Sequence, residues 1–205
     1  MSINYFERGN DPKESLGIGV KTLIKEWLES MNINKYFITR KLLIDVYDNV
    51  DISNKDLTEF PEYINFRKIT GSFVCSHNKL ITLRGAPHIV YGSFHCCDNQ
   101  LSSLEFGPYK VKGSYIAHQN KLISLKSLPK TLNTFSCHHN NLRSLEYIPR
   151  ELYGDLYCYN NQLSSLKHLP KRIDGDLHIS FNKYSKFSIE EIRDVCWVEG
   201  TIRIL

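Results

Sequence analysis

Residues 92–108 read GSFHCCDNQLSSLEFGP, and this pattern returns along most of the chain. An asparagine marks each return, at steps of 21, 21, 20, 21 and 21 residues: Asn78, Asn99, Asn120, Asn140, Asn161 and Asn182. Prolines and glycines keep the same phase: Pro87, Pro108, Pro129, Pro149 and Pro170, and Gly71, Gly92, Gly113, Gly154 and Gly175, with Asn133 in the remaining glycine position. Three residue types in one phase indicate a structural repeat.

The unit reads apolar-x-(Cys/Ala/Ile)-x-x-Asn-x-Leu-x-x-Leu-x-x-x-Pro, which is the leucine-rich-repeat signature. Each unit buries its apolar side chains only on its neighbours, so the chain is expected to form one elongated α/β repeat solenoid. Short parallel strands should line its concave face. We expect a helical N-terminal cap over residues 1–47, the solenoid over residues 48–187 and a helix–strand C-terminal cap over residues 188–205.

The composition is that of an ordinary globular protein. Of 205 residues, 41% are hydrophobic and 23% are charged, with a formal net charge of +4. This charge is too small to indicate a nucleic acid or a membrane as the partner. The chain has neither a signal-peptide-like start nor a run of about 18 apolar residues, which predicts a cytoplasmic location.

The cysteines follow the repeat. Four of them occupy the position three residues before the asparagine, where the other units have Ala117 and Ile179: Cys75, Cys96, Cys137 and Cys158. A position that accepts Cys, Ala and Ile is predicted to be a small buried apolar slot, because free cysteine behaves as a small hydrophobe. A disulfide or a metal framework is the alternative, although no CxxC spacing occurs.

The remaining repeat residues suggest structural roles. An inward asparagine amide is expected to satisfy the backbone where each strand turns, since it carries both donors and acceptors. The glycine that opens each strand is expected to adopt a special backbone conformation, which Asn133 would tolerate next best. Proline ends each loop, and a 21-residue unit leaves no room for a long convex helix.

Both ends depart from the repeat. Over residues 13–31 the apolar residues recur at helical spacing, and this stripe is expected to cover the open end of the solenoid. Residues 43–46 and 50–52 read as strands around a tight turn at Asp48-Asn49. Ser188 and Glu191 form a capping box that starts a short helix before a last strand. Two closed ends suggest a complete protein.

Period-2 alternation defines the outward side chains of the predicted concave face. These are the predicted partner-binding residues: Val74, Ser76, His95, Cys97, Ile116, His118, Ser136, His138, Tyr157, Tyr159, His178 and Ser180. The next residue of each unit extends the surface: His77, Asp98, Gln119, His139, Asn160 and Phe181. A surface rich in His and Tyr with few charges favours protein recognition.

Other uses of this surface have weaker support. We predict no catalytic residue, no metal and no cofactor, although Cys97, His118 and His138 on neighbouring units, with His139 or Asp98, could bind zinc. His95, Cys97 and Asp98 on an open sheet would not exclude water, so the chain is predicted not to be an enzyme.

Basic loops offer a second mode of binding. Between Lys110 and Lys186 there are 12 Lys or Arg and 5 Asp or Glu, a net of +7. Six of the basic residues lie in the predicted loops: Lys126, Lys130, Arg150, Lys167, Lys171 and Arg172. A basic rim of this kind could hold a nucleic acid or another anion.

The chain resembles the small leucine-rich-repeat proteins of tailed bacteriophages. The resemblance covers residues 13–205 and is carried by the entry helix, VDISNKDLTEFP at residues 50–61, the GSFxCxxNxLxSLxxxP units and FSIEEIRDVCWVEGTIRI at residues 187–204. It implies a solenoid that acts in the host cytoplasm on a host or viral protein, or as part of a viral assembly. LPKTLNTFSCHHNNLRSL at residues 128–145 is also similar to the repeats of secreted bacterial ubiquitin-ligase effectors, but no ligase domain follows.

Overall fold

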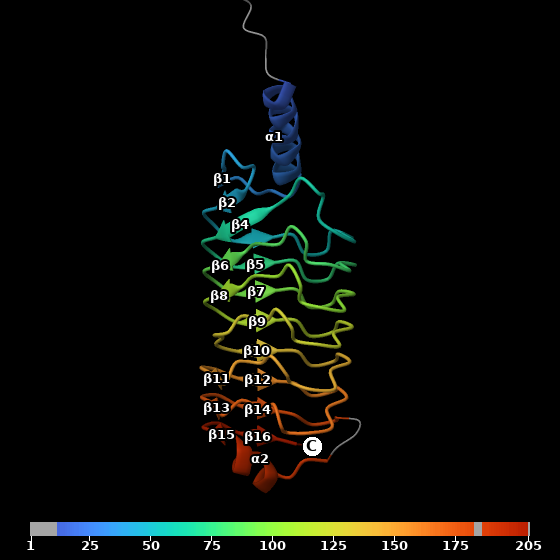
Figure 1. The fold of residues 1–205 in the computed structure, drawn as a ribbon, viewed down its shortest axis with the longest axis vertical. Coiled ribbons are helices and arrows are strands. Elements are labelled where there is room, and N and C mark those ends of the chain that lie inside the picture. The colour runs from blue at the N-terminus through green and yellow to red at the C-terminus, as the bar shows by residue number, and fades with distance from the viewer. Residues whose placement is uncertain (1–11, 183–185, 205) are drawn as a thin grey trace, which may run out of the picture.

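The chain winds into a stack of turns in which one strand of every turn joins a single parallel sheet (Figure 1). The computed structural model describes residues 12–182 and 186–204, so residues 1–11, 183–185 and 205 of the predicted caps and solenoid lie outside it. Each strand of the eight-stranded sheet has two residues: β3 (Val50–Asp51), β5 (Phe73–Val74), β7 (Phe94–His95), β9 (Tyr115–Ile116), β10 (Phe135–Ser136), β12 (Leu156–Tyr157), β14 (Leu177–His178) and β16 (Ile202–Arg203). This is the predicted parallel-strand solenoid.

A second set of short strands lies just before the glycine of most repeats, and it was not predicted from the sequence. It forms a five-stranded sheet of β1 (Tyr36–Ile38), β2 (Ile44–Val46), β4 (Phe66–Ile69), β6 (Ile89–Val90) and β8 (Lys110–Val111). A three-stranded sheet continues it with β11 (Glu151–Leu152), β13 (Arg172–Ile173) and β15 (Trp197–Val198). Only the β1–β2 pair is antiparallel among the described strands. The strands predicted at 43–46 and 50–52 exist as β2 and β3, but they belong to different sheets.

The repeat glycines are explained by close packing, and the prediction of a special backbone conformation at them is wrong. Among the described glycines only Gly85 has a positive φ. A Cβ on Gly92 would lie 2.5 Å from Ser72 Oγ and 2.7 Å from the Gly71 carbonyl carbon, closer than atoms can approach. Glycine is therefore required where successive turns touch. The second set of strands is interrupted at the turn that carries Asn133, where Leu132 forms only an isolated bridge to Leu152.

The left-handed conformation falls instead on the residue before each asparagine. This residue has φ between 50° and 55° in six turns: His77, Asp98, Gln119, His139, Asn160 and Phe181. Non-glycine residues adopt this region only when the surrounding structure holds them there.

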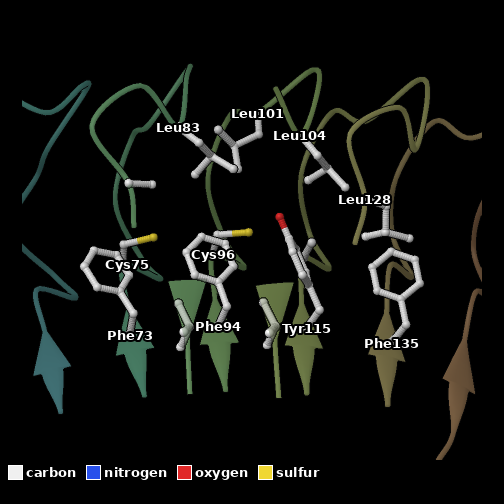
Figure 2. Close-up of a cluster of buried hydrophobic side chains, with 14 of the residues drawn as sticks. Phe73, Cys75, Leu83, Phe94, Cys96, Leu101, Leu104, Tyr115, Leu128 and Phe135 are labelled. Atoms are coloured by element: carbon white, nitrogen blue, oxygen red, sulfur yellow. The ribbon is translucent and has the colours of Figure 1, made fainter. Parts of the chain in front are cut away.

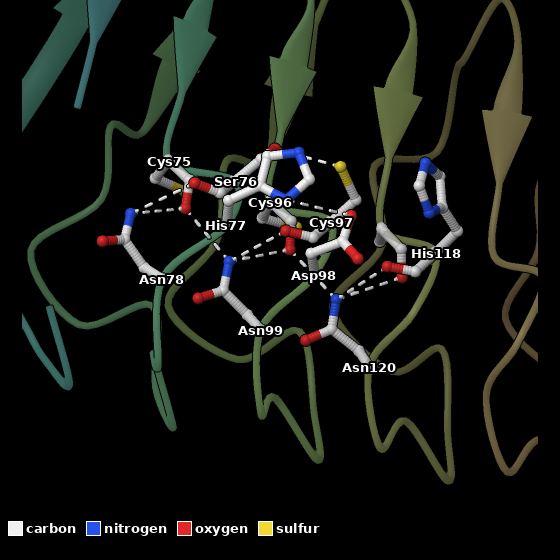
Figure 3. Close-up of polar contacts among 11 residues, drawn as sticks. Cys75, Ser76, His77, Asn78, Cys96, Cys97, Asp98, Asn99, His118 and Asn120 are labelled. Carbon is white, nitrogen blue, oxygen red and sulfur yellow. Dashed lines mark hydrogen bonds and ion pairs between the residues drawn. The ribbon is translucent and has the colours of Figure 1, made fainter. Parts of the chain in front are cut away.

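The asparagine side chains satisfy the backbone groups of each turn, as predicted, and these bonds surround the left-handed residue (Figure 3). Asn99 Nδ2 donates to the carbonyls of Cys96 and Cys97 in its own turn, at 3.2 and 3.1 Å, and to that of Cys75 in the preceding turn at 3.0 Å. Its Oδ1 accepts a hydrogen bond from the N–H of Leu80 at 2.9 Å. The same four contacts recur at Asn120, Asn140, Asn161 and Asn182, so each carboxamide ties two turns together.

The core is a column of stacked side chains between the two sets of strands and the loops (Figure 2). Phe73, Phe94, Tyr115 and Phe135 follow one another with ring centroids 5.8, 5.0 and 5.9 Å apart. The four repeat cysteines are fully buried and free, which confirms the predicted apolar slot. The apolar column stabilises the solenoid only when neighbouring turns are present, because no turn covers its own side chains.

The two helices lie at opposite ends of the stack. Helix α1 (Pro12–Ser30) packs Ile24, Trp27 and Leu28 against the first turns, with Trp27 touching Phe60 and Phe66. It points along the stack and does not lie across its end (Figure 1). Leu23 on the predicted apolar stripe is 44% exposed.

Helix α2 (Ile189–Val195) begins with the predicted capping box. The N–H of Glu191 donates to Ser188 Oγ at 3.1 Å, and Glu191 Oε2 accepts from the N–H of Ser188 at 2.8 Å. β15 and β16 then extend both sets of strands. Neither helix, over the described residues, has the length and apolar character that crossing a membrane requires.

The asparagine ladder can be tested at two adjacent asparagines. Asn140 is buried and makes the four ladder contacts, whereas Asn141 is exposed and its Oδ1 accepts only from Gln162 Nε2. Asn140→Ala should lower the free energy of unfolding by about 3 kcal/mol because it leaves buried backbone groups unpaired. Asn141→Ala should change it by less than about 0.5 kcal/mol. Urea unfolding followed by circular dichroism measures both, and equal effects would contradict the ladder's role.

Candidate functional site

The predicted partner-binding residues form two rows on the eight-stranded sheet. The first row follows the strand register: Val74, His95, Ile116, Ser136, Tyr157 and His178 are paired residue to residue. The second row lies two residues further on in each turn: Ser76, Cys97, His118, His138, Tyr159 and Ser180. We call these two rows the sheet face. Asp51 and Arg203 continue the first row at its two ends.

The small residues of the sheet face are buried by their neighbours. Ser76, Cys97, Ser136 and Ser180 are 3, 8, 5 and 2% exposed. Alternation along the strand places these residues on the outer side, yet their short side chains are almost fully enclosed. They therefore offer a partner little contact area, and the accessible part of the sheet face consists of its rings and of Val74 and Ile116.

Four of these rings form a continuous stack. His118 and His138 have centroids 4.3 Å apart with planes inclined by 9°, and His138 and Tyr159 have centroids 4.2 Å apart, also inclined by 9°. Tyr159 stacks on His178 at 4.2 Å, although His178 belongs to the first row. We call these four residues the ring stack. His178 reaches Tyr159 because the second-row residue of its turn, Ser180, is small and bonds His178 Nε2 at 2.6 Å.

Hydrogen bonds link His138 of the ring stack to His139 and Asn160 at its edge. Asn160 Nδ2 lies 3.0 Å from His139 Nε2, and His139 Nδ1 lies 2.8 Å from His138 Nδ1. An amide nitrogen only donates, so His139 Nε2 accepts and its Nδ1–H donates to His138. In this arrangement His138 Nδ1 is an acceptor.

The pKa values of the stack agree with neutral rings. Burial, with the neighbouring imidazoles, lowers the pKa of His138 to about 4. Burial also lowers the pKa of His118 and, with Arg203, that of His178. The pKa of His95 in the first row is lowered by burial as well. At neutral pH the sheet face is therefore an uncharged surface between its terminal Asp51 and Arg203.

A group of metal-binding side chain types lies at one edge of the ring stack (Figure 3). Donor atoms of Cys97, Asp98 and His118 all lie within 4.8 Å of one another, the only such group of three among the described residues. His138, which the sequence placed with Cys97 and His118, is not part of it. The Cys97 Sγ donates to Ser76 Oγ at 3.1 Å, and burial raises the pKa of this thiol.

The basic residues do not gather on the sheet face. Of the six predicted residues, Arg172 begins strand β13, and the other five lie outside the strands. Arg172 is paired with Asp174 at 2.5 Å and approaches Glu199 at 3.9 Å, and Lys171 Nζ donates to the carbonyl of Val195 at 3.4 Å. Two of the six predicted anion-binding residues are thus already engaged within the chain.

Comparisons with known proteins find likenesses to solved structures. No protein-family model matches the chain, and no curated protein matches it. The leucine-rich-repeat domain of a Shigella effector can be superimposed with a TM-score of 0.46 at 15% sequence identity, covering 95% of this chain and 93% of that one. The strand register and the sequence repeat themselves define the fold.

The contribution of the ring stack is testable at Tyr159. Tyr159→Ala removes a ring held between two imidazoles and should lower the free energy of unfolding by about 1–2 kcal/mol. Tyr153 is 59% exposed, and Tyr153→Ala should change it by less than about 0.5 kcal/mol. Urea denaturation at neutral pH measures both variants. A Tyr159 effect no larger than the Tyr153 effect would show that the stacking contributes nothing to stability.

Proposed function

We propose that this chain is a non-catalytic protein–protein interaction module that binds its partner through the sheet face. The observation that carries the proposal is the ring stack, flanked by Tyr157, His95 and Ile116. Aromatic rings that already contact one another lose little conformational entropy on binding, and aromatic residues are enriched in interface cores. The absence of charge between Asp51 and Arg203 removes the main desolvation cost of covering this surface.

The identity of the partner rests on the resemblance to phage proteins alone. On that basis the chain is a phage-encoded protein that acts in the host cytoplasm on a host or viral protein. The alternative that the same resemblance offers is a structural component of a viral assembly. We further propose that residues 1–47 and 188–205 serve as caps, a role supported by the packing of Trp27 and by the burial of Ile192 in α2.

Nucleic acid or another anion bound by the basic loops is a different mode of binding. The ion pairs of Arg172 count against it, and salt separates it from binding by the sheet face. Phosphate contacts weaken steeply with salt, whereas a mostly uncharged interface does not.

The test is affinity capture from bacterial lysate that has been treated with nuclease and washed at high salt. Three baits are compared: the chain itself, a Tyr157→Glu/His138→Glu double variant of the sheet face, and an Ile123→Glu/Tyr147→Glu control. Ile123 and Tyr147 are 69 and 55% exposed and lie in loops away from the sheet face. A specific partner should be recovered by the chain and by the control, and reduced roughly tenfold or more by the sheet-face variant.

Circular dichroism first establishes that both variants are folded. A partner retained equally by all three baits would place binding elsewhere on the molecule. Recovery of nucleic acid alone, when nuclease and salt are omitted, would favour the basic loops.

A further inference from the structure

The edge of the ring stack brings together side chains from two successive turns. Cys97 and His118 hold the same second-row position, and Asp98 is the left-handed residue, at φ 53°, that follows Cys97. Parallel strands are about 4.8 Å apart, so equivalent positions on neighbouring turns are within reach of a single ion. The thiol, the carboxylate and the imidazole all lie on one side of the asparagine ladder (Figure 3).

A fourth donor comes from the preceding turn. His77 Nδ1 lies 3.6 Å from Asp98 Oδ2, and the His77 side chain is 57% exposed, so its ring is free to turn toward the group. Ser76 Oγ, from the same turn as His77, accepts the Cys97 Sγ hydrogen bond and holds the sulfur in place. Three consecutive turns therefore contribute to one small region.

His118 supplies an independent observation. Its Nδ1 is buried and has no hydrogen-bond partner within the described residues. A buried polar atom without a partner costs free energy, and such atoms are rare in native proteins. Either imidazole nitrogen binds zinc, with the other donating to a neighbour, so a metal at this ring gives the orphaned nitrogen a role.

We propose that Cys97, Asp98 and His118 bind one zinc ion on the sheet face, with His77 as the fourth ligand. Sulfur, nitrogen and carboxylate oxygen together suit zinc, whereas calcium and magnesium take oxygen ligands. One thiolate and one carboxylate also balance the charge of a divalent ion. Binding replaces the thiol proton of Cys97, which passes to the solvent.

The required movement is small. Zinc–sulfur bonds are about 2.3 Å and zinc–nitrogen or zinc–oxygen bonds about 2.0–2.2 Å, so tetrahedral donors lie roughly 3.3–3.6 Å apart. The donors of Cys97, Asp98 and His118 already lie within 4.8 Å of one another. Rotation about side-chain bonds closes the difference without moving the strands, which the asparagine ladder holds in place.

The experiment uses the full chain, stripped of metal with a chelator and dialysed. Zinc affinity is measured by competition with a chromophoric chelator, and cobalt is bound in parallel because a thiolate ligand gives a charge-transfer band in the near ultraviolet. We expect one ion per chain and a thiolate–cobalt band. The other five cysteines are 0 to 2% exposed, so Cys97→Ser should abolish this band.

Variants separate this site from weak binding by exposed histidines. Cys97→Ser and His118→Gln should each weaken zinc binding by about 100-fold or more, and His77→Gln by about tenfold. His138→Gln is the matched control, because His138 is the stacked neighbour of His118 but lies outside the group. It should keep both the affinity and the cobalt band.

Each outcome decides the proposal. Zinc bound equally by Cys97→Ser, a missing thiolate–cobalt band, or a loss in His138→Gln as large as that in His118→Gln would overturn the site. An unchanged affinity in His77→Gln would overturn His77 as the fourth ligand. Thermal unfolding of the metal-free variants shows whether any loss is a loss of fold, and the measurement does not depend on a protein partner.

Discussion

The buried carboxamide of the repeat asparagine is the interaction on which the rest of this structure depends. Each strand of the main sheet ends in a turn whose carbonyls and N–H groups point inward, where no water reaches them. One Asn side chain satisfies these groups in its own turn and in the turn before it. In the six turns that contain it, this side chain fixes the spacing to the preceding turn and holds the residue before it in the left-handed conformation.

A fixed turn height makes the surface of the solenoid as regular as its core. Side chains at equivalent positions are held one strand spacing apart, which is close to the contact distance of two aromatic rings. The ring stack on the outside and the column from Phe73 to Phe135 on the inside are two results of this spacing. The convergence of Cys97 and His118 is a third. A different residue at one outward position of a repeat therefore changes the chemistry of the surface without changing the fold.

Much of this architecture could be predicted from the sequence, because the repeat encodes it in residue types with distinct physical roles. The inward asparagine, the small apolar cysteine slot, the parallel strands and the Ser188 capping box all follow from local chemistry. The role of glycine could not be inferred in the same way. A glycine selected for close approach and one selected for positive φ look alike in a sequence, and only the neighbouring turn at Ser72 distinguishes them.

The sequence predicts which residues form the two rows of the sheet face. It does not predict which of their side chains contact one another. Alternation places Ser76, Ser136 and Ser180 on the outer side, yet burial depends on the size of their neighbours on adjacent turns. His178 of the first row stacks on Tyr159 of the second row in the preceding turn, and this requires a small residue at position 180. Such a contact joins two repeats, so the sequence of one repeat does not show it. The sequence also grouped His138 with Cys97, but His138 lies two turns away from Cys97 and outside the group of donors.

The free cysteines along the core couple folding to redox chemistry. Cys75, Cys96, Cys137 and Cys158 are fully enclosed, and burial raises the pKa of each thiol, so neither oxidant nor thiolate chemistry is accessible in the native chain. Unfolding removes both protections together. A chain that opens in an oxidising medium exposes several thiols at once, and crosslinks between them then block refolding. The lifetime of the native solenoid outside a reducing environment is therefore governed by how often it opens, a kinetic property that its equilibrium stability does not describe.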